Sequence, residues 1–340
     1  MRIGITYDLK SDAPPPAGIP DDFQEEFDSP ITVDAIAAVL RGLGHTVEKL
    51  GDSREMLQRV LANPPDFVFN FAEGQGIGRS REARVPAVLE MLGIPYSGSD
   101  PLTLAVTLDK DCAKKLIAAE GVAVALGRVI HPAALPGAQY TVPPTWGPAI
   151  STLKFPVIAK PAWEGSSKGI RNKSVIERLE QLPDFVAAMQ CDYQQPILIE
   201  EYIEGDELTV GLVGNDPPEI IGIMRVESRE KTDRFVYGLD VKRDYQRLVR
   251  YECPAPLSAP DEAAVRDATM KVWYSLGCRD VARVDFRLRE GVPYFLEVNP
   301  LPGLKPVDSD LVILAELVGW SYERLIRRIF QAALQRCGIR

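Results

Sequence analysis

The residue types best suited to chemistry lie on two adjacent stretches in the last quarter of the chain. Asp285 belongs to "VARVDFRLR", and Glu297 and Asn299 belong to "VPYFLEVNPLPG", which follows after a short turn. The first stretch alternates apolar and polar residues, as a half-buried strand does. We therefore expect an antiparallel hairpin in which Asp285 lies opposite Glu297, with Arg283 opposite Asn299.

This register makes the other face of the hairpin apolar throughout. The expected cross-strand pairs on that face are Val284 with Val298, Phe286 with Leu296 and Leu288 with Tyr294. A slip by one residue would mix apolar and charged positions, so the pattern favours this pairing over its neighbours.

Two carboxylates directly opposite each other repel, unless a cation or a shared proton lies between them. Asp285, Glu297 and Asn299 form an all-oxygen donor set, which suits a hard divalent ion. Mg²⁺ takes one or two protein carboxylates and completes its octahedron with phosphates and water. The hairpin therefore predicts a phosphate-bound Mg²⁺ site with Arg283 beside it. An exposed cluster of salt bridges is the alternative.

Length and charge limit the possible classes. The chain has 340 residues, of which 46% are hydrophobic and 26% charged, and its net charge is -9. We expect two or three domains. The negative charge disfavours nucleic acid or an anionic membrane as a partner. No membrane-spanning run or signal-peptide pattern is found in the sequence.

Histidine and cysteine usage excludes two further classes of site. The two histidines, His45 and His131, argue against a histidine-ligated zinc or a Ser-His-Asp hydrolase. The five cysteines show no C-x-x-C spacing, which indicates reduced thiols and a cytoplasmic protein. Any catalysis must depend on carboxylates, lysine, arginine, serine and a metal.

The elements that would position these residues follow an alternating pattern. Short apolar runs at 2–7, 45–50 and 66–71 predict strands, and 31–44, 53–61 and 81–93 predict helices, which together indicate an open α/β sheet. We expect two helices within 100–121, a loop or boundary at 132–156, strands at 155–161 and 195–203, and helices at 174–190 and 261–277.

An acidic, proline-rich insert, "KSDAPPPAGIPDDFQEEFDSP" (10–30), separates the first strand from the first helix. Ligands bind at this edge of an open α/β sheet. The insert could therefore be a lid over a site or a solvated loop.

Two loops have the composition of nucleotide contacts. "EGSSKGI", from Glu164 to Ile170, is glycine-rich and follows a strand that ends near Lys160; its amides and hydroxyls could face phosphate. "LIEEYIEGDELTV" (198–210) carries acids on both sides of a glycine turn, which could hold an adenine amino group and ribose hydroxyls. A flexible turn and a solvated charged turn are the alternatives.

Four motifs in this order resemble the ATP-grasp superfamily, and within it the D-alanine-D-alanine ligase family: "GIPYSGSDPLTLAVTLDK", "KPAWEGSSKGI", "IEEYIEGDELTV" and "RVDF…LEVNPLPG". The resemblance covers nearly the whole chain. It implies an α/β and α+β protein with the ATP-grasp fold, in which an N-terminal open parallel-sheet domain (1–98) precedes two α+β domains (99–203 and 204–340) that clamp ATP.

The resemblance also implies roles for individual residues. The implied nucleotide contacts are Lys110, Lys160, Glu164, Ser167, Glu200 (adenine), Glu201, Ile203 and Glu207 (ribose). The implied catalytic residues are Ser166 of the glycine-rich loop, Lys242 of a mobile loop, and Arg283 with the Gly303 amide as the oxyanion-stabilising pair. The implied metal ligands are Asp285, Glu297 and Asn299, for two Mg²⁺ ions or, alternatively, Mn²⁺.

The sequence departs from the family at the positions that bind amino acids. The family's glutamate near the first helix falls on Pro30, with Asp28 the nearest acid, and its His-Gly reads Glu73-Gly74. Arg243 replaces a tyrosine, and Asp308, next to Ser309, replaces the serine that binds the acceptor carboxylate. Arg79, Arg81 and Arg84 could bind a carboxylate instead, or be exposed helix arginines.

These observations predict an ATP-dependent carboxylate-amine ligase that forms an amide through an acyl phosphate. Its expected partners are small amino-acid or peptide-like molecules other than two D-alanines. A true D-alanine-D-alanine ligase and a non-catalytic nucleotide-binding protein are the alternatives, with a kinase less favoured. A homodimer is possible, because homodimers are common in the resembled family.

Overall fold

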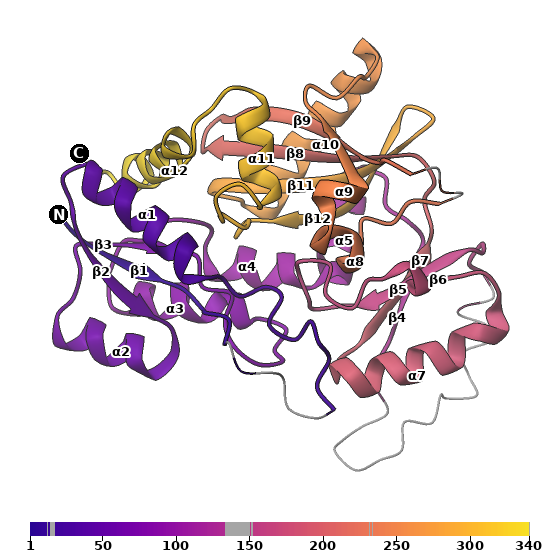
Figure 1. The fold of residues 1–340 in the computed structure, drawn as a ribbon, viewed down its shortest axis with the longest axis horizontal. Coiled ribbons are helices and arrows are strands. Elements are labelled where there is room, and N and C mark those ends of the chain that lie inside the picture. The colour runs from indigo at the N-terminus through magenta and orange to yellow at the C-terminus, as the bar shows by residue number, and fades with distance from the viewer. Residues whose placement is uncertain are drawn as a thin grey trace.

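The computed structural model of the chain describes residues 1–11, 13, 18–132, 150, 152–230, 232 and 234–339. Most of the predicted boundary loop at 132–156 lies outside these residues. The fold contains three sheets, arranged around a common junction (Figure 1).

The N-terminal sheet is parallel, with strand order β2-β1-β3. Its strands are β1 (Arg2–Thr6), β2 (Thr46–Gly51) and β3 (Phe67–Asn70), and its helices are α1 (Pro30–Gly42), α2 (Ser53–Ala62) and α3 (Arg84–Met91). These bounds confirm the alternating pattern of the first hundred residues to within a few positions. In α1 the apolar positions repeat at helical spacing, so that Ile36, Ala37 and Leu40 are buried against the sheet.

The second sheet has the order β4-β7-β5-β6, and its neighbouring strands are antiparallel. It is formed by β4 (Gly127–Ile130), β5 (Val157–Pro161), β6 (Val175–Ile176) and β7 (Ile197–Glu201). Helix α7 (Leu182–Tyr193) packs against it (Figure 1). The predicted helix at 174–190 was therefore wrong at its start. Residues 172–181 form two 3₁₀ turns and β6, and Pro183 fits only the first turn of a helix.

The third sheet has five antiparallel strands in the order β10-β9-β8-β11-β12. They are β8 (Asp206–Gly214), β9 (Pro218–Ser228), β10 (Val249–Glu252), β11 (Asp280–Arg289) and β12 (Val292–Asn299). The associated helices are α8 (Leu239–Arg243), α9 (Tyr245–Leu248), α10 (Ala259–Leu276), α11 (Asp310–Leu317) and α12 (Tyr322–Arg336).

The β11-β12 hairpin has the predicted register at its functional end and a different one beyond it. Asp285 pairs with Glu297, Arg283 with Asn299, and Val284 with Val298, as expected. A bulge then shifts the ladder, so that Phe286 pairs with Phe295, and Leu288 with Pro293. The predicted pairs of Phe286 with Leu296 and of Leu288 with Tyr294 were wrong because strict alternation assumes no extra residue.

The bulge has a consequence for the site. Phe295, and not Leu296, turns into the core, where its ring meets that of Phe286 edge to face with centroids 6.2 Å apart. Leu296 is the extra residue, and both Leu296 and Glu297 line the same cavity. Bulges are common next to active sites because they re-aim side chains in this way.

Packing crosses the predicted domain boundaries at two places. Helices α4 (Pro101–Leu108) and α5 (Lys110–Ala119) pack against α10 and β12 of the third sheet, although they precede the second sheet in the chain. Helix α12 returns to α1, so the two chain ends lie near each other (Figure 1). The division at residues 98 and 203 stays a prediction, since the cores do not follow chain order.

Two further expectations concern the whole chain. The five cysteines are free thiols, as their spacing predicted. In the part of the chain that the structure describes, no helix combines the length and the apolar composition that crossing a membrane requires.

Replacement of Phe330 by alanine tests the packing of α12 against the N-terminal sheet. Phe330 is 2% exposed and meets Phe67 of β3 edge to face at 5.5 Å between ring centroids. We expect Phe330→Ala to lower the free energy of unfolding by about 3–5 kcal/mol, because the cavity left behind adds to the lost burial. Denaturant unfolding measures this.

The control is Leu317→Ala, on the exposed side of α11, where 45% of the side chain is accessible. We expect this change to cost less than about 0.5 kcal/mol, as for most surface positions. Equal effects of the two substitutions would show that α12 does not depend on this contact.

Candidate active site

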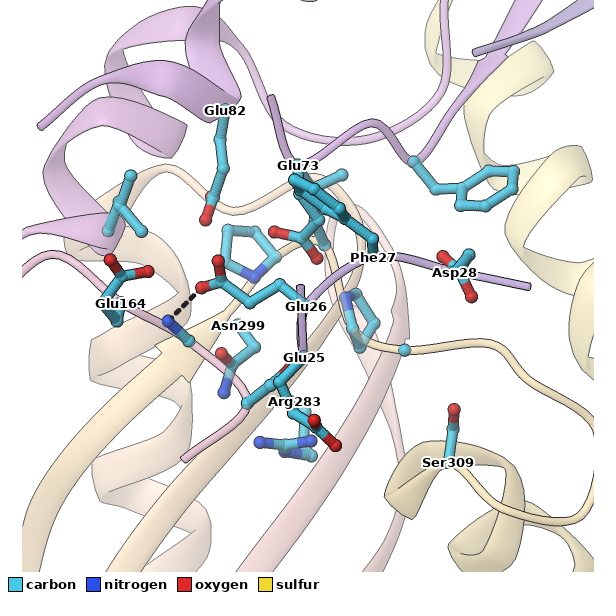
Figure 2. A pocket seen from close by; sticks show the side chains of 18 of the residues that line it. Glu25, Glu26, Phe27, Asp28, Glu73, Glu82, Glu164, Arg283, Asn299 and Ser309 are labelled. Atoms are coloured by element: carbon cyan, nitrogen blue, oxygen red, sulfur yellow. Dashed lines mark hydrogen bonds between the residues drawn. The ribbon is translucent and has the colours of Figure 1, made fainter. Parts of the chain in front are cut away.

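Two cavities meet at the junction of the three sheets, and Arg283 and Glu297 line both. The smaller, of about 90 Å³, lies between the second and third sheets and is called the nucleotide cavity below. The larger, of about 220 Å³, lies between these sheets and the N-terminal domain and is called the acidic cavity. Figure 2 shows the acidic cavity, with Arg283 on the side opposite Glu73 and Glu82.

Most predicted ATP residues line the nucleotide cavity. They are Lys160, Ser167, Glu200, Glu201, Ile203, Glu207, Lys242, Arg283, Asp285 and Glu297. Strands β5, β7, β8, β11 and β12 supply most of them, because each ends or turns at this place. The sequence motifs therefore converge in space although they are spread over more than 130 positions.

Glu200 is the best neutralised carboxylate of the nucleotide cavity. It is buried, and its oxygens lie 2.6 Å from Nζ of Lys160 and 2.9 Å from Nζ of Lys114. Burial raises its pKa, but the two lysines more than offset this and lower the pKa to about 2. Burial also lowers the pKa of Lys114 to about 8. Lys114 was not predicted from the sequence. The one indication there is its position one helical turn after Lys110, which places both lysines on the same face of α5.

The remaining acids of this cavity also have partners. Glu207 forms an ion pair with Arg287 at 2.6 Å, and Glu201 accepts a hydrogen bond from the backbone N–H of Lys154 at 2.8 Å. Lys242 lies 3.7 Å from Asp310, at the start of α11, and 4.8 Å from the centre of the Tyr237 ring. Asp310 was not identified from the sequence, where it is one acid among several.

Asp285, Glu297 and Asn299 lie together as predicted. Asp285 accepts hydrogen bonds from Thr209 at 2.9 Å and from Asn299 at 3.4 Å, and Arg283 pairs with it at 2.9 Å. Burial raises the pKa of Asp285, whereas Lys110, 2.8 Å from Glu297, holds the pKa of Glu297 well below its usual range against the effect of burial.

This donor set fits a hard cation that shares its ligands with phosphate. It offers two carboxylates and an amide oxygen, on a hairpin that keeps the two carboxylates directly opposed. Among the described residues no three His, Cys, Asp or Glu side chains form a metal cage. An ion held here would therefore take most of its ligands from outside the protein, as Mg²⁺ does.

The glycine-rich loop between β5 and β6 divides the two cavities. Ser166 lines the acidic cavity and Ser167 lines the nucleotide cavity, where its hydroxyl donates to the carbonyl of Tyr237 at 3.0 Å. Both serines have positive φ, 49° and 58°. Each such non-glycine conformation costs about 1–3 kcal/mol and is found mainly at functional sites.

The other predicted residues line the acidic cavity. They are Asp28, Glu73, Lys110, Glu164, Asn299, Gly303, Asp308 and Ser309. Two of them, Glu164 and Lys110, were expected at the nucleotide. Both line the acidic cavity and not the nucleotide cavity. Lys110 nevertheless pairs with Glu297, which lines both cavities. A Cβ at Gly303 would lie 2.8 Å from Oγ of Ser309, so a larger residue there would require Ser309 to shift.

Arg243 lines neither of the two cavities. Its guanidinium pairs with Asp21 at 2.6 Å and with Glu25 at 2.8 Å, both on the insert. The geometry therefore gives no support to the predicted contact of Arg243 with substrate, because the acidic insert attracts its side chain away from the cavity.

Arg81 forms a buried ion cluster that sequence analysis did not identify. It is 2% exposed and lies 2.6 Å from Glu26 and 3.1 Å from Glu164, which also pairs with Lys168 at 2.9 Å. Burial raises the pKa of Glu26, but Arg81 and Lys168 more than offset this and lower it. The expectation that Arg81 could be an exposed helix arginine was wrong, because it lies where α3 begins, facing the insert.

The insert forms a cross-domain clamp, which we define as residues 18–28. Asp22 is fully buried and accepts the Gly169 N–H and the Tyr193 hydroxyl, each at 2.9 Å. Glu26 accepts the Gly165 N–H. Of the two alternatives left open by the sequence, the described part of the insert is thus packed against the glycine-rich loop and is not a solvated loop.

The wall opposite Arg283 carries carboxylates that nearby cations influence without pairing with them: Arg81 for Glu73 and Glu82, and Lys10 and Lys305 for Asp28. Glu73 and Glu82 share a hydrogen bond, and neither is part of an ion pair within the described residues, nor is Asp28. Burial, and for Glu73 the neighbouring Glu82, raises these pKa values: well above the usual value for Glu73, to about 7 for Glu82 and to about 6 for Asp28.

Comparison with known proteins agrees with this geometry. The family model described as D-ala D-ala ligase C-terminus matches residues 142–331. The uncharacterized protein y4sG of Sinorhizobium fredii is 33% identical over 314 residues, which are 89% of this chain and 87% of that protein. A D-alanine–D-alanine ligase of Gloeobacter violaceus is 32% identical over 301 residues, 88% of this chain and 92% of that protein.

A solved structure shows the same fold. The D-alanine–D-alanine ligase of Bacillus anthracis aligns with a TM-score of 0.75 over 99% of this chain and 98% of that chain, at 24% identity. The three sheets and the cavity between the second and third define an ATP-grasp enzyme. The chain belongs to the D-alanine–D-alanine ligase family and is an ATP-dependent, ADP-forming ligase.

Replacement of Asp22 by alanine tests the cross-domain clamp, because Asp22 lines neither the acidic nor the nucleotide cavity. We expect faster amide hydrogen exchange in the glycine-rich loop at 165–170, since the Gly169 N–H loses its buried acceptor. Asp34→Ala, at an exposed position on α1, is the matched control and should leave exchange in this loop unchanged. Equal exchange in both variants would contradict the clamp.

The raised pKa of Glu82 predicts how stability depends on pH. The folded state holds this proton more tightly than the unfolded state, so the contribution is complete below the ordinary pKa of 4.5 and is lost as pH rises through about 7. We expect the free energy of unfolding to be on the order of 1 kcal/mol higher at about pH 5.5 than at about pH 8 from this group.

The variant Glu82→Gln isolates that contribution from those of the surrounding Glu73, Glu26, Arg81 and Lys110. We expect its unfolding free energy to depend less on pH than that of the unchanged protein, measured by denaturant titration at both pH values. Glu120→Gln, exposed at the end of α5, should keep the full dependence. An unchanged slope in Glu82→Gln would show that Glu82 is ionised throughout.

Proposed function

We propose that this ligase joins a carboxylate and an amine in two steps, with substrates other than two D-alanines. The carboxylate attacks the γ-phosphate of ATP to give an acyl phosphate, and the amine then displaces phosphate to form an amide. The observation that carries the proposal is that the nucleotide cavity and the acidic cavity share Arg283 and Glu297. A phosphate held in one cavity can thus reach a carboxylate held in the other.

Positioning and charge neutralisation would supply most of the catalysis, because phosphoryl transfer asks for little covalent chemistry from the protein. Lys160, next to Glu200, and Lys242, next to Asp310, would face the phosphates from two sides. Arg283 and the Gly303 amide would stabilise negative charge that develops on the acyl oxygen. Ser166 would orient the substrate at the boundary between the cavities.

Asp285, Glu297 and Asn299 would hold Mg²⁺, one ion or two, with Mn²⁺ as an alternative. Such an ion supplies charge stabilisation to the phosphates. Arg283 pairs with Asp285, and Lys110 pairs with Glu297, so both carboxylates of the proposed metal site lie beside a cation.

The acidic cavity supports altered specificity. Asp308, which by the sequence resemblance stands in place of the serine that binds the acceptor carboxylate, lines the acidic cavity, pairs with Lys305 and accepts the Tyr245 hydroxyl. Ser309 accepts the Lys305 N–H at 2.9 Å. A substrate carboxylate at this place would meet like charge, which disfavours D-alanine as the acceptor. A cytoplasmic location and a homodimer remain predictions of the sequence and of the family.

The first experiment measures ADP release with ATP and Mg²⁺, across acids and amines taken singly and in pairs, with products identified by mass. We expect an amide product and no turnover with D-alanine alone. Turnover of D-alanine to its dipeptide would establish the ordinary family activity. ATP binding without any amide would support a non-catalytic nucleotide-binding protein, and a phosphate ester would indicate a kinase.

Replacement of Glu297 by glutamine tests the shared centre. We expect turnover to fall by about 10²-fold or more, because the variant loses a charge that both the metal and the phosphates require. Glu323→Gln, on the exposed first turn of α12, should retain turnover. Unchanged turnover in Glu297→Gln would exclude the proposed metal site.

A further inference from the structure

The acidic cavity has an unusual charge distribution along its length. At one end, Arg283 and Lys110 lie beside the nucleotide cavity and can receive a carboxylate. At the other end, Glu73 and Glu82 point into the cavity from the N-terminal domain (Figure 2). A molecule that spans the cavity therefore meets positive charge at the phosphate side and negative charge at the far side.

The two carboxylates at the far end form no ion pair among the described residues, although Arg81 lowers the pKa of both. Glu82 is only 7% exposed, and the hydrogen bond recorded for its side chain joins it to the carboxyl of Glu73. The neighbouring acids differ, because Arg81 neutralises Glu26, and Arg81 with Lys168 neutralises Glu164. Asp28, on the same cavity, also lacks an ion pair within the described residues.

Glu73 and Glu82 are joined by a hydrogen bond in which one of the two carboxyl groups must carry a proton. Both residues face the acidic cavity, so a bound cation can replace that shared proton. Among the described residues no third His, Cys, Asp or Glu joins Glu73 and Glu82 in a metal-binding cluster. An ammonium group suits the site better, since it offers three hydrogen-bond donors and a positive charge.

A single α-ammonium group would leave part of this charge uncompensated. Glu73 and Glu82 form one pair of acceptors, and Asp28, just before the first helix in the chain, is a further acceptor on the same cavity.

We infer that the carboxylate donor of this ligase is a diamino acid, whose side-chain ammonium group is held by Glu73 and Glu82. Its carboxylate lies toward Arg283 and the nucleotide cavity, and its second ammonium group faces the remaining acids of the wall. This inference rests on the proposed ligase function and specifies its substrate class. It also gives a role to the acid at Glu73, where the resembled family has a histidine.

The test compares diamino acids with neutral amino acids of the same shape. Ornithine and lysine, each in D and L form, are titrated calorimetrically into the protein with a non-hydrolysable ATP analogue and Mg²⁺, and norvaline and norleucine serve as matched neutral probes. We expect one diamino acid to bind about tenfold or more tightly than its neutral match, as a charge-assisted hydrogen bond provides.

Two variants assign the preference to the acidic wall. Glu82→Gln should lose the preference for the diamino acid while it keeps its affinity for the ATP analogue, and Glu73→Gln should act in the same direction. Glu120→Gln, which lines neither cavity, should keep the preference. Binding should also release protons from the wall, seen as a dependence of the heat on the ionisation enthalpy of the buffer.

The outcomes for the two proposals are separate. Neutral amino acids that bind as tightly as diamino acids, or no amino acid binding at all, would overturn the diamino-acid inference. If neutral pairs then gave amide and ADP, the ligase function would stand without it. If no pair gave ADP, the ligase function would fail, and the binding comparison would still decide the charge preference of the cavity.

Discussion

The ion pair between Lys110 and Glu297 is the contact on which the site depends. Nζ of Lys110 lies 2.8 Å from the carboxylate at the end of β12 and 2.5 Å from the carbonyl oxygen of Glu164 in the glycine-rich loop. One side chain from α5 thus connects the third sheet with the loop of the second. Because the pair is mostly buried, loss of either partner would leave an uncompensated charge, which typically costs about 3–5 kcal/mol.

The clamp adds a second connection of the same kind. Glu26 and Asp22 bring the N-terminal domain onto the glycine-rich loop through backbone N–H groups and through Arg81. The loop that would hold phosphate is therefore positioned by all three parts of the chain. This explains how Ser166 and Ser167 can keep positive φ values, since strained conformations persist only where surrounding contacts determine them.

The two cavities differ in how their charges are balanced. In the nucleotide cavity each acid has a lysine, arginine or amide partner, so a polyanion such as ATP meets an environment that is already neutralised. In the acidic cavity Glu73, Glu82 and Asp28 lack such partners. The residues that the resemblance assigns to ATP thus lie mostly in the cavity with paired charges, and the departures from the family pattern at Asp28 and Glu73 lie in the other.

Local sequence pattern was enough for most of the elements. Apolar periodicity placed β1, α1 and the β11-β12 hairpin within a few residues, because the spacing of apolar side chains along one segment shows which of its faces is buried. The pairing of Asp285 with Glu297 followed from alternation alone and is confirmed. The bulge at Leu296 did not follow, since an extra residue leaves no mark in an apolar-polar pattern.

Only the tertiary structure determined the acidic cavity. Glu26, Arg81 and Glu82 are ordinary charged residues in sequence, and their burial arises because the insert, α3 and the glycine-rich loop meet in space. Lys114 became a partner of Glu200 for the same reason. The sequence by itself determined the family and the residues proposed to bind a nucleotide, because these lie in motifs. The fold determined which charges are compensated, because burial and pairing depend on residues far apart in the chain.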